Sequence, residues 1–328
     1  MSARARSALV LAAGRGDRLW PLTAVRAKPA VPLAGEPLVR RILRRLVSAG
    51  IEDVVVNLHH LPATIAGAVG DGSDLGVRVR YSWEQPLLGS AGGPRRAAPL
   101  FDEPRFFIVN GDTLEDVELD ALSAAHSESG AEVTMALVSP PAGRSVGGVR
   151  LDADGFVCRF TPRGHDPRAW HFVGVQLAEA SAFARLDEGI RAESVNALYP
   201  ALMAGNARAI FGFRSSATHR EVGTPRDYLE HCLALAAREG RPESLAGAGS
   251  RIDPSARLVD SVIWDRVEIG ADSALERTIV TDGVVVPAGT RHRDAILTAD
   301  VPGVTPGPGY GVTGVKTTDS GRTSADGC

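Results

Sequence analysis

The sequence predicts an α/β protein with a mostly parallel sheet covered by helices on both faces, followed by a short left-handed parallel β-helix. Short apolar runs alternate with helical patterns up to about residue 240, which is the order of βαβ units. A glycine-rich segment directly follows the first apolar run. Between residues 252 and 289, aliphatic residues recur every six positions, the spacing of hexapeptide repeats.

The elements of the first part are expected in chain order. Residues 8–13 predict a buried strand, and residues 36–50 predict a helix with Pro37 near its first turn and Gly50 at its end. Further strands are expected at residues 54–58, 77–81, 106–109, 133–138, 148–151, 157–160 and 172–177, and further helices at 62–69, 91–100 and 224–238. Ligands of such sheets bind beyond the carboxyl ends of the strands.

We expect one domain over residues 1–241 and a β-helix over 250–300. In the β-helix, one row of aliphatic residues at six-residue spacing is Ile263, Ile269 and Leu275, and a second is Val267, Ile279 and Val285. Irregular strands packed on the main domain are the alternative. Two or three coils need a cap or a partner surface, which favours a homo-oligomer. Residues 302–328 are rich in Gly, Ser, Thr and Pro and are expected to be disordered.

Composition limits the classes of partner. The net charge of −3 and the pI near 6.3 argue against a nucleic-acid binder. The three cysteines lack a metal or redox spacing, which favours a reducing compartment, and we expect a cytoplasmic protein. The short apolar start enters a glycine-rich turn and is read as a strand, not a signal peptide, and no apolar run is long enough to span a membrane.

The segment that follows the first strand predicts a polyphosphate site. Gly14 and Gly16 allow the backbone to approach an anion closely, and Arg18 and Lys28 add two positive charges. Only Lys28 and Lys316 are lysines among 36 basic residues. An ammonium is a compact point charge that a planar guanidinium does not replace, so Lys28 is a candidate for contact with a phosphate oxygen.

Five motifs together resemble the sugar-phosphate nucleotidyltransferase family, also called the NDP-sugar pyrophosphorylases. The motifs are residues 11–38, Glu84 with 88–93, 110–113, 172–175 and 221–225. They are most similar to the mannose-1-phosphate guanylyltransferase and N-acetylmuramate-1-phosphate uridylyltransferase branches. The resemblance implies the Rossmann-like nucleotide-diphospho-sugar transferase fold. It also implies transfer of NMP from an NTP, with GTP or UTP expected, to a sugar 1-phosphate, with Mg²⁺ as cofactor.

The resemblance also assigns roles to single residues. Arg18 is expected to bind the β- and γ-phosphates, and Lys28 the α-phosphate and the attacking sugar phosphate. The residues expected to bind the nucleotide are Leu11, Ala12, Ala13, Gly14, Gly16, Glu84, Gly89 and Gly111. Those expected to bind the sugar phosphate are Gly147, Arg163 and Gly174. Asp112 and Glu221 are the expected Mg²⁺ ligands, and a carboxylate that only caps local amides is the alternative for Asp112.

Two departures from the family pattern leave alternatives open. Glu221 stands where the family has aspartate, so it binds the metal directly, binds it through water, or is structural. The Glu-Lys-Pro motif of the sugar pocket is absent at residues 160–163, and His219 aligns with a tryptophan. A catalytically silent sensor or regulatory subunit that binds nucleotide sugars is therefore the alternative to the enzyme.

Overall fold

The computed structural model describes residues 5–140, 146–164, 166, 168–241, 245–299 and 311–315. They form two compact units. The first is Met1–Arg15, Ala27–Ala30 and Pro37–Glu221, and the second is Gly16–Arg26, Val31–Glu36 and Val222–Cys328. These units differ from the domain boundary expected near residue 241. The segments Gly16–Arg26 and Val31–Glu36 and the helix at residues 225–238 belong to the same unit as the β-helix.

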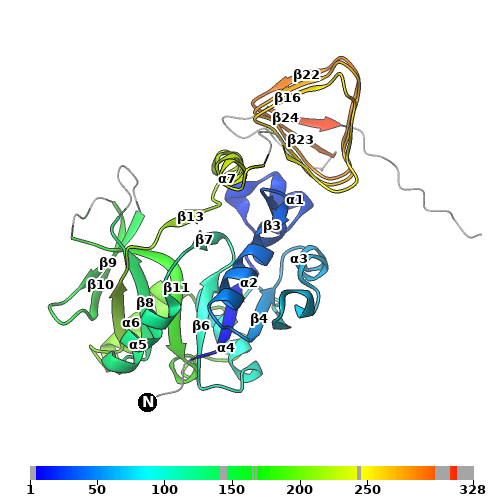
Figure 1. Ribbon diagram of the computed structural model, residues 1–328. Helices are drawn as coiled ribbons and strands as arrows, with labels where there is room; N and C mark the ends of the chain where they lie inside the picture. Colours follow the sequence, from blue (N-terminus) through cyan, green and yellow to red (C-terminus); the bar gives the residue numbers. More distant parts are fainter. Residues whose placement is uncertain are drawn as a thin grey trace, which may run out of the picture. The chain divides into compact units, whose positions relative to one another are not determined.

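A seven-stranded sheet is the centre of the first unit (Figure 1). In sheet order its strands are β12 (Ile210–Arg214), β8 (Val133–Val138), β11 (His171–Glu179), β6 (Arg105–Asn110), β1 (Ser7–Leu11), β4 (Asp53–Leu58) and β5 (Arg78–Trp83). Neighbours are parallel except β11, which is antiparallel to β6 and β8. The interior strands are apolar on both faces, as expected where both faces are covered. The predicted mixed, mostly parallel sheet is confirmed.

Helices cover this sheet. α4 (Gly89–Ala97) packs against β1, β4 and β5, whereas α5 (Leu119–Ser129) packs against β8, β11 and β12. The remaining longer helices of this unit are α2 (Leu38–Ser48), α3 (Pro62–Val69) and α6 (Tyr199–Gly205). The helix expected from residue 36 begins at Leu38 instead, because the preceding residues form a hairpin of β2 (Pro32–Leu33) and β3 (Glu36–Pro37). Ala34 and Gly35 reverse the chain there with φ of 49° and 80°.

Two small ribbons complete the first unit. β7 (Thr113–Glu115) pairs antiparallel with β13 (His219–Glu221), and β9 (Val146–Leu151) pairs antiparallel with β10 (Val157–Gly164). The sequence analysis did not anticipate β7, β12, β13, α5 or α6.

The second unit contains the predicted β-helix. Its three parallel sheets are β14-β17-β20-β23-β24, β15-β18-β21 and β16-β19-β22. Their strands are β14 (Leu245–Ala246), β15 (Arg251–Ile252), β16 (Arg257–Val259), β17 (Val262–Ile263), β18 (Glu268–Ile269), β19 (Ala274–Glu276), β20 (Ile279–Val280), β21 (Val285–Val286), β22 (Arg291–Arg293), β23 (Ala295–Ala299) and β24 (Gly311–Val315).

Successive coils of the β-helix are offset by 17 residues, whereas three hexapeptides would give about 18. Ile263, Ile269 and Leu275 are buried at successive sheets of one coil, as the first predicted row requires. The residue of the next coil that lies in register with Ile263 is Val280, only five residues after Leu275. The second predicted row fails at Val285 for this reason, and Val286 is buried in its place.

Helix α7 (Pro225–Arg238) and the segment Gly16–Arg26 pack on the β-helix within the second unit. The indole N–H of Trp264 donates to the Tyr228 hydroxyl at 2.9 Å, and that hydroxyl donates to the carbonyl of Pro32 at 2.6 Å. Burial raises the pKa of Tyr228 well above its usual value. Arg26 lies 2.6 Å from a carboxylate oxygen of both Asp265 and Asp282. The aromatic pair and these ion pairs join three segments that are distant in the sequence.

Part of the tail that was expected to be disordered is a strand. Residues 311–315 form β24 alongside β23, because three of the five residues are β-branched (Val312, Thr313 and Val315) and suit a strand that extends an existing ladder. Residues 300–310 and 316–328 lie outside the described residues. None of the helices in the described ranges has the length and apolar character that crossing a membrane requires.

Candidate active site

The loop after β1 carries the predicted phosphate-binding glycines. The side-chain oxygen of Asn57, on β4, accepts hydrogen bonds from the N–H groups of Ala12 at 2.5 Å and Ala13 at 3.2 Å. Gly14 and Arg15 are exposed, and in the described part of the chain their N–H groups have no hydrogen-bond partner. The amides of Ala12 and Ala13 are therefore occupied by Asn57, and those of Gly14 and Arg15 are available to an anion.

An added Cβ at Gly14 would meet no described atom within 4 Å, so the packing of the protein does not require glycine there. Gly111 is different. Its N–H donates to the carbonyl of Leu11 at 2.9 Å, and an added Cβ would come within 2.6 Å of that oxygen. Gly111 therefore allows the loop after β6 to approach the end of β1, which brings two predicted motifs together.

Lys28 and Asp112 form an ion pair at the ends of these strands. Lys28 begins a short 3-10 helix, η2 (Lys28–Ala30), and its Nζ lies 2.7 Å from Oδ2 of Asp112. The Lys28 side chain is 8% exposed and the Asp112 side chain 29%. The Thr113 hydroxyl donates to the other carboxylate oxygen, Oδ1, at 3.0 Å. A nearly buried ammonium and a partly open carboxylate are thus fixed side by side.

The structure also brings Glu221 to this carboxylate's neighbourhood. In the β7–β13 ribbon, Glu221 lies opposite Thr113, the residue that follows Asp112. The two acids come from segments more than 100 residues apart, yet Asp112 directly precedes β7 and Glu221 ends β13, the strand that pairs with it. Within the described ranges, no group of three or more His, Cys, Asp or Glu side chains could hold a metal ion.

The expected base-binding segment is tightly organised. Glu84 is buried, and its two carboxylate oxygens accept from Nδ2 of Asn57 at 2.7 Å and from the N–H of Leu88 at 2.8 Å. Gly89 has a φ of 80°, and an added Cβ would come within 2.7 Å of both the Ala192 carbonyl and a Glu193 carboxylate oxygen. Gly89 therefore makes room for the chain at residues 192–193.

The predicted sugar-phosphate residues lie on β9, β10 and β11. Gly174 has a φ of 84°, and an added Cβ would come within 2.5 Å of Nδ2 of Asn110. Gly147 is exposed on β9. Arg163 is part of β10, but its side chain lies outside the described part of the structure.

Two histidines that the sequence analysis did not select as site residues lie beside these elements. The rings of His171 and His219 are 4.9 Å apart. Burial lowers the pKa of His171, as does the nearby His219, whereas a hydrogen bond to the backbone of Gly147 and the charge of Glu221 oppose the decrease. The alignment of His219 with a family tryptophan was the one sequence signal for this cluster.

Gly16 and Arg18 belong to the second unit. Gly16 has a φ of 71°, and its carbonyl accepts from the Thr23 hydroxyl at 3.2 Å. Arg18 is exposed in the short 3-10 helix η1 (Asp17–Leu19) that follows. This exposure suits a cation that meets a ligand from solvent.

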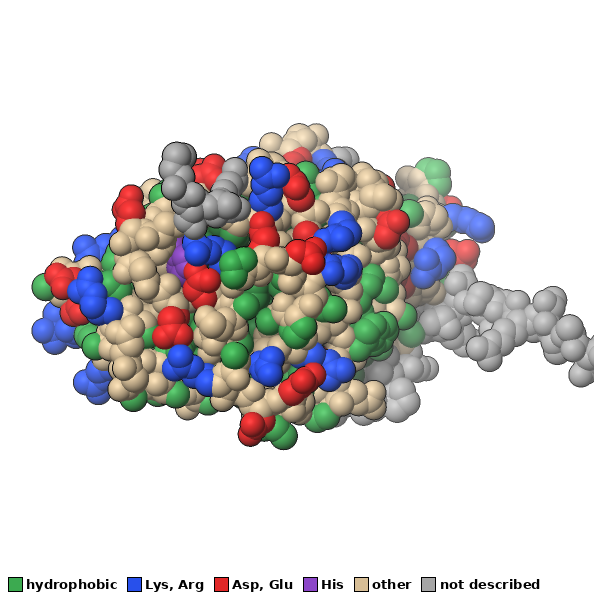
Figure 2. Space-filling model, turned by 90° about the horizontal axis from the view of Figure 1, so that it is seen from below, with side chains coloured by type: hydrophobic (Ala, Val, Ile, Leu, Met, Phe, Trp, Pro, Cys, Tyr) green, Lys and Arg blue, Asp and Glu red, His purple; other side chains and the backbone are tan. Residues whose placement is uncertain are grey.

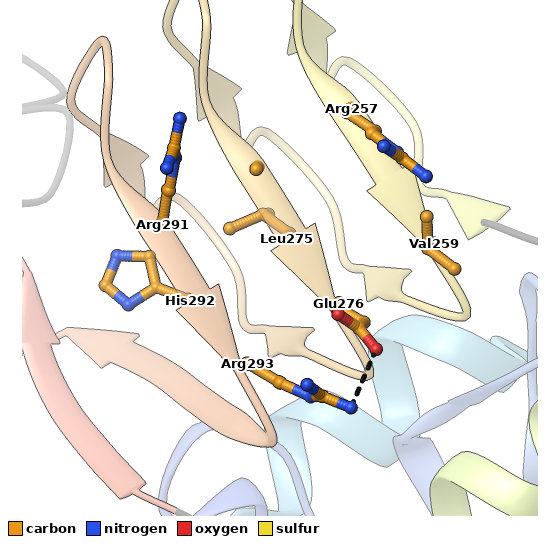
Figure 3. A pocket seen from close by; sticks show the side chains of 8 residues that line it. Arg257, Val259, Leu275, Glu276, Arg291, His292 and Arg293 are labelled. Atoms are coloured by element: carbon orange, nitrogen blue, oxygen red, sulfur yellow. Dashed lines mark ion pairs between the residues drawn. The ribbon is translucent and has the colours of Figure 1, made fainter.

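The β-helix has a cavity of its own, of about 390 Å³, on the sheet β16-β19-β22 (Figure 3). It is lined by residues of these three strands, among them Arg257, Leu275 and Arg293, the last of which forms an ion pair with Glu276 at 3.2 Å. None of the predicted site residues lines it. On the face shown in Figure 2, basic and acidic side chains are interspersed without a continuous basic surface.

The family model Nucleotidyl transferase matches residues 7–236, and the model GlmU-like, C-terminal hexapeptide matches residues 240–292. A mannose-1-phosphate guanylyltransferase of Mycobacterium tuberculosis is 32% identical over 292 residues, covering 86% of this chain and 81% of that protein. An N-acetylmuramate alpha-1-phosphate uridylyltransferase of Neisseria meningitidis is 35% identical over 222 residues, covering 66% and 93%.

Solved structures share the fold at low identity. HddC from Yersinia pseudotuberculosis superposes with a TM-score of 0.61 at 19% identity and covers 70% of this chain and 99% of that one. A second structure of HddC, in complex with GMP-PN, superposes with a TM-score of 0.59 at 18% identity.

Proposed function

Since the chain belongs to the nucleotidyl transferase family, we propose that it transfers GMP or UMP from the corresponding triphosphate to a sugar 1-phosphate in a Mg²⁺-dependent reaction. It is an enzyme of the sugar-phosphate nucleotidyltransferase class, which forms nucleotide sugars. Guanine and uracil are proposed as the candidate bases because one of the two relatives is named a guanylyltransferase and the other a uridylyltransferase. The observation that carries the proposal is the Lys28–Asp112 ion pair where β1 and β6 end.

The proposed reaction exchanges one bond at the α-phosphorus for another. An oxygen of the sugar 1-phosphate forms a bond to the α-phosphorus, while the bond from that phosphorus to the oxygen bridging to the β-phosphate breaks. The bonding electrons leave with pyrophosphate. Because the attacking oxygen is already anionic, no general base is needed, and the task of the protein is to bring the anions together and stabilise their charge.

The chain's own groups fit this task. Lys28 donates from Nζ to an α-phosphate oxygen and to the incoming sugar phosphate, and Asp112 holds that ammonium in place. The N–H groups of Gly14 and Arg15 bind the triphosphate, which explains why glycine occupies position 14 although the protein leaves space for a larger residue. Arg18 is proposed to bind the β- and γ-phosphates.

Asp112 and Glu221 fit a Mg²⁺ ion. The donor set is two carboxylates, one directly before β7 and one at the end of its partner strand β13, and Mg²⁺ in such sites keeps water and phosphate oxygens as further ligands. When bound, the ion would supply charge neutralisation of the phosphate oxygens. The sugar phosphate is proposed to bind at Gly147, Arg163 and Gly174.

The experiment is a panel of GTP and UTP against common sugar 1-phosphates, with pyrophosphate release as the readout. We expect release with at least one pair, dependent on Mg²⁺, and a loss of at least about 10²-fold in kcat for Asp112→Asn. Binding of a nucleotide sugar without turnover on the whole panel would reject the enzyme and favour the sensor. Full activity of Asp112→Asn would reject the role of the carboxylate.

Two further expectations extend from this proposal. Glu221→Gln is expected to raise the Mg²⁺ concentration at half-maximal rate more than Glu221→Asp does, because only aspartate keeps a carboxylate.

The expected homo-oligomer stays a prediction, and its mass in solution is measured by light scattering.

A further inference from the structure

Two buried polar side chains connect the loop after β1 to the N-terminus of α4. Asn57 and Glu84 are each 3% exposed. Asn57 accepts from the N–H groups of Ala12 and Ala13 and donates through Nδ2 to Glu84 at 2.7 Å. The second oxygen of Glu84 accepts from the N–H of Leu88 at 2.8 Å. The hydrogen bonds therefore run without interruption from one loop to the other.

We propose that this Asn57–Glu84 pair is a positioning device that holds the phosphate-binding loop and the base-binding segment at the spacing of one nucleoside triphosphate. The inference rests on the proposed function and deepens it. It names Asn57 as a positioning residue that the sequence did not reveal. It also gives Glu84 the role of ordering the base-binding segment through the backbone of Leu88.

Burial of the polar side chains of Asn57 and Glu84 is unfavourable, which indicates that the pair has a role. β4 is otherwise built from valine and leucine apart from Asp53 at its start, and a carboxylate and an amide in such surroundings are unfavourable unless they are hydrogen bonded. Both carboxylate oxygens of Glu84 and both polar ends of Asn57 have partners. The backbone of Glu84 is held as well, since its carbonyl oxygen lies 2.9 Å from Nδ1 of His59.

The glycine-rich start of α4 is shaped around the pair. An added Cβ at Gly93 would come within 2.6 Å of Oε1 of Glu84 and 2.9 Å of Nδ2 of Asn57. Alanine at this position would push the two side chains aside. The glycine thus serves the Asn57–Glu84 pair and not only the helix.

The pair also decides which amides face a ligand. Asn57 takes the N–H groups of Ala12 and Ala13, so those of Gly14 and Arg15 are the next along the loop. Because the base and phosphates of one nucleotide are joined covalently, a change in the spacing of the two loops weakens binding of the whole nucleotide. It leaves the sugar phosphate, which binds elsewhere in the proposed site, unaffected.

The test uses two single variants and the exchange of the two groups. Asn57→Asp places two carboxylates together, and Glu84→Gln places two amide groups together. The double variant N57D/E84Q restores every bond with the polarity reversed. In that variant the carboxylate at position 57 accepts from the amides of Ala12 and Ala13 and from the amide at position 84, whose oxygen accepts from Leu88.

We expect each single variant to raise the KM for the triphosphate about tenfold, as for loss of a hydrogen bond to a charged group, while the KM for the sugar phosphate stays within about twofold. The double variant should recover most of the loss. Thr134→Val on β8 is the matched control, since it removes a buried hydrogen bond to His126 of 2.8 Å on a strand that is not adjacent to β1 or β4. It should leave the nucleotide KM unchanged.

Three results would overturn the proposal: an unchanged nucleotide KM in both single variants, an equal rise in both KM values, or a double variant no better than the singles. Calorimetric binding of GTP and UTP to the same four proteins and the wild type gives a second readout. If the wild type releases no pyrophosphate with any pair, the proposed function fails, and these affinities still decide the role of the pair. Thermal unfolding separates a fold defect from weaker binding, and the double variant keeps the test valid if a single variant does not fold.

Discussion

At the scale of single residues, the proposed function depends most on Lys28. It is a nearly buried ammonium in a chain that otherwise uses arginine almost throughout, and it lies 2.7 Å from Asp112. Lys28→Ala is expected to lower kcat by about 10²- to 10³-fold, as for loss of a donor that stabilises the transition state. Lys28→Arg should not restore the rate, because a planar guanidinium does not fit the place of a point charge.

The measurement for Lys28 is steady-state pyrophosphate release. Lys316→Ala, at the only other lysine, is the control and should be indistinguishable from the wild type. Full activity of Lys28→Arg would show that a positive charge alone suffices at this position. It would contradict the proposal that the compact ammonium is required.

Sequence reasoning located residues whose types stand out in a motif, such as Lys28 and Asp112, and the structure places these two in contact. It could not locate Asn57 or His171. Asn57 lies inside an apolar run, and its role depends on β4 pairing with β1. The contact of His171 with His219 depends on packing between residues that the chain separates widely.

At the scale of elements, Gly174, which lies inside β11 at an irregularity of its pairing with β8, tests how closely β11 approaches the end of β6. The backbone at φ 84° is unfavourable for alanine by about 1–2 kcal/mol, and the overlap with Asn110 adds to this cost. Gly189→Ala is the matched control, because Gly189 has a φ of 76° but open space around it. We expect denaturant unfolding to show a larger loss for Gly174→Ala. Equal losses would show that the contact with Asn110 is easily relieved.

The third coil of the β-helix has a histidine in its inward row. His292 lies in register with Leu275, and burial lowers its pKa from the usual 6.5. Below about pH 6.5 the unfolded chain binds a proton that the folded chain takes up only at lower pH, so stability decreases with falling pH.

His292→Leu removes this proton uptake and is therefore expected to stabilise the protein more at about pH 5.5 than at about pH 8. Denaturant unfolding at the two pH values measures the difference. An equal gain at both would mean that the imidazole is equally easy to protonate in the folded state.

The elements that sequence could predict are those with long apolar runs or a clear apolar stripe, such as β1, β4 and α2. The β7–β13 ribbon could not be predicted, because its strands have three residues each and pair across the chain. The six-residue period predicted the β-helix, but not the five-residue step from Leu275 to Val280 that shifts the later rows.

At the scale of the whole molecule, Arg26 connects the N-terminal segment of the second unit to its β-helix. Its side chain is 15% exposed and lies between Asp265 and Asp282. The double variant D265N/D282N leaves a mostly buried guanidinium without its counterions, and we expect a loss of stability on the order of 2 kcal/mol or more. Asp154→Asn, at an exposed ion pair with Arg208, is the control and should change little.

A double variant as stable as the wild type would contradict the anchoring role of Arg26. The sequence could not anticipate this grouping of segments, since the residues that join them are 239 and 256 positions apart.

The central claim is that the site at the carboxyl ends of the parallel strands β1 and β6 binds a triphosphate through backbone amides, Lys28 and a metal held by Asp112. A crystal structure with Mn²⁺ and a non-hydrolysable analogue of GTP or UTP tests it most directly. The account predicts the metal on the Asp112 carboxylate, phosphate oxygens on the amides of Gly14 and Arg15, and Nζ of Lys28 within hydrogen-bond distance of the α-phosphate. A nucleotide bound elsewhere, or a metal that Asp112 does not touch, would contradict it.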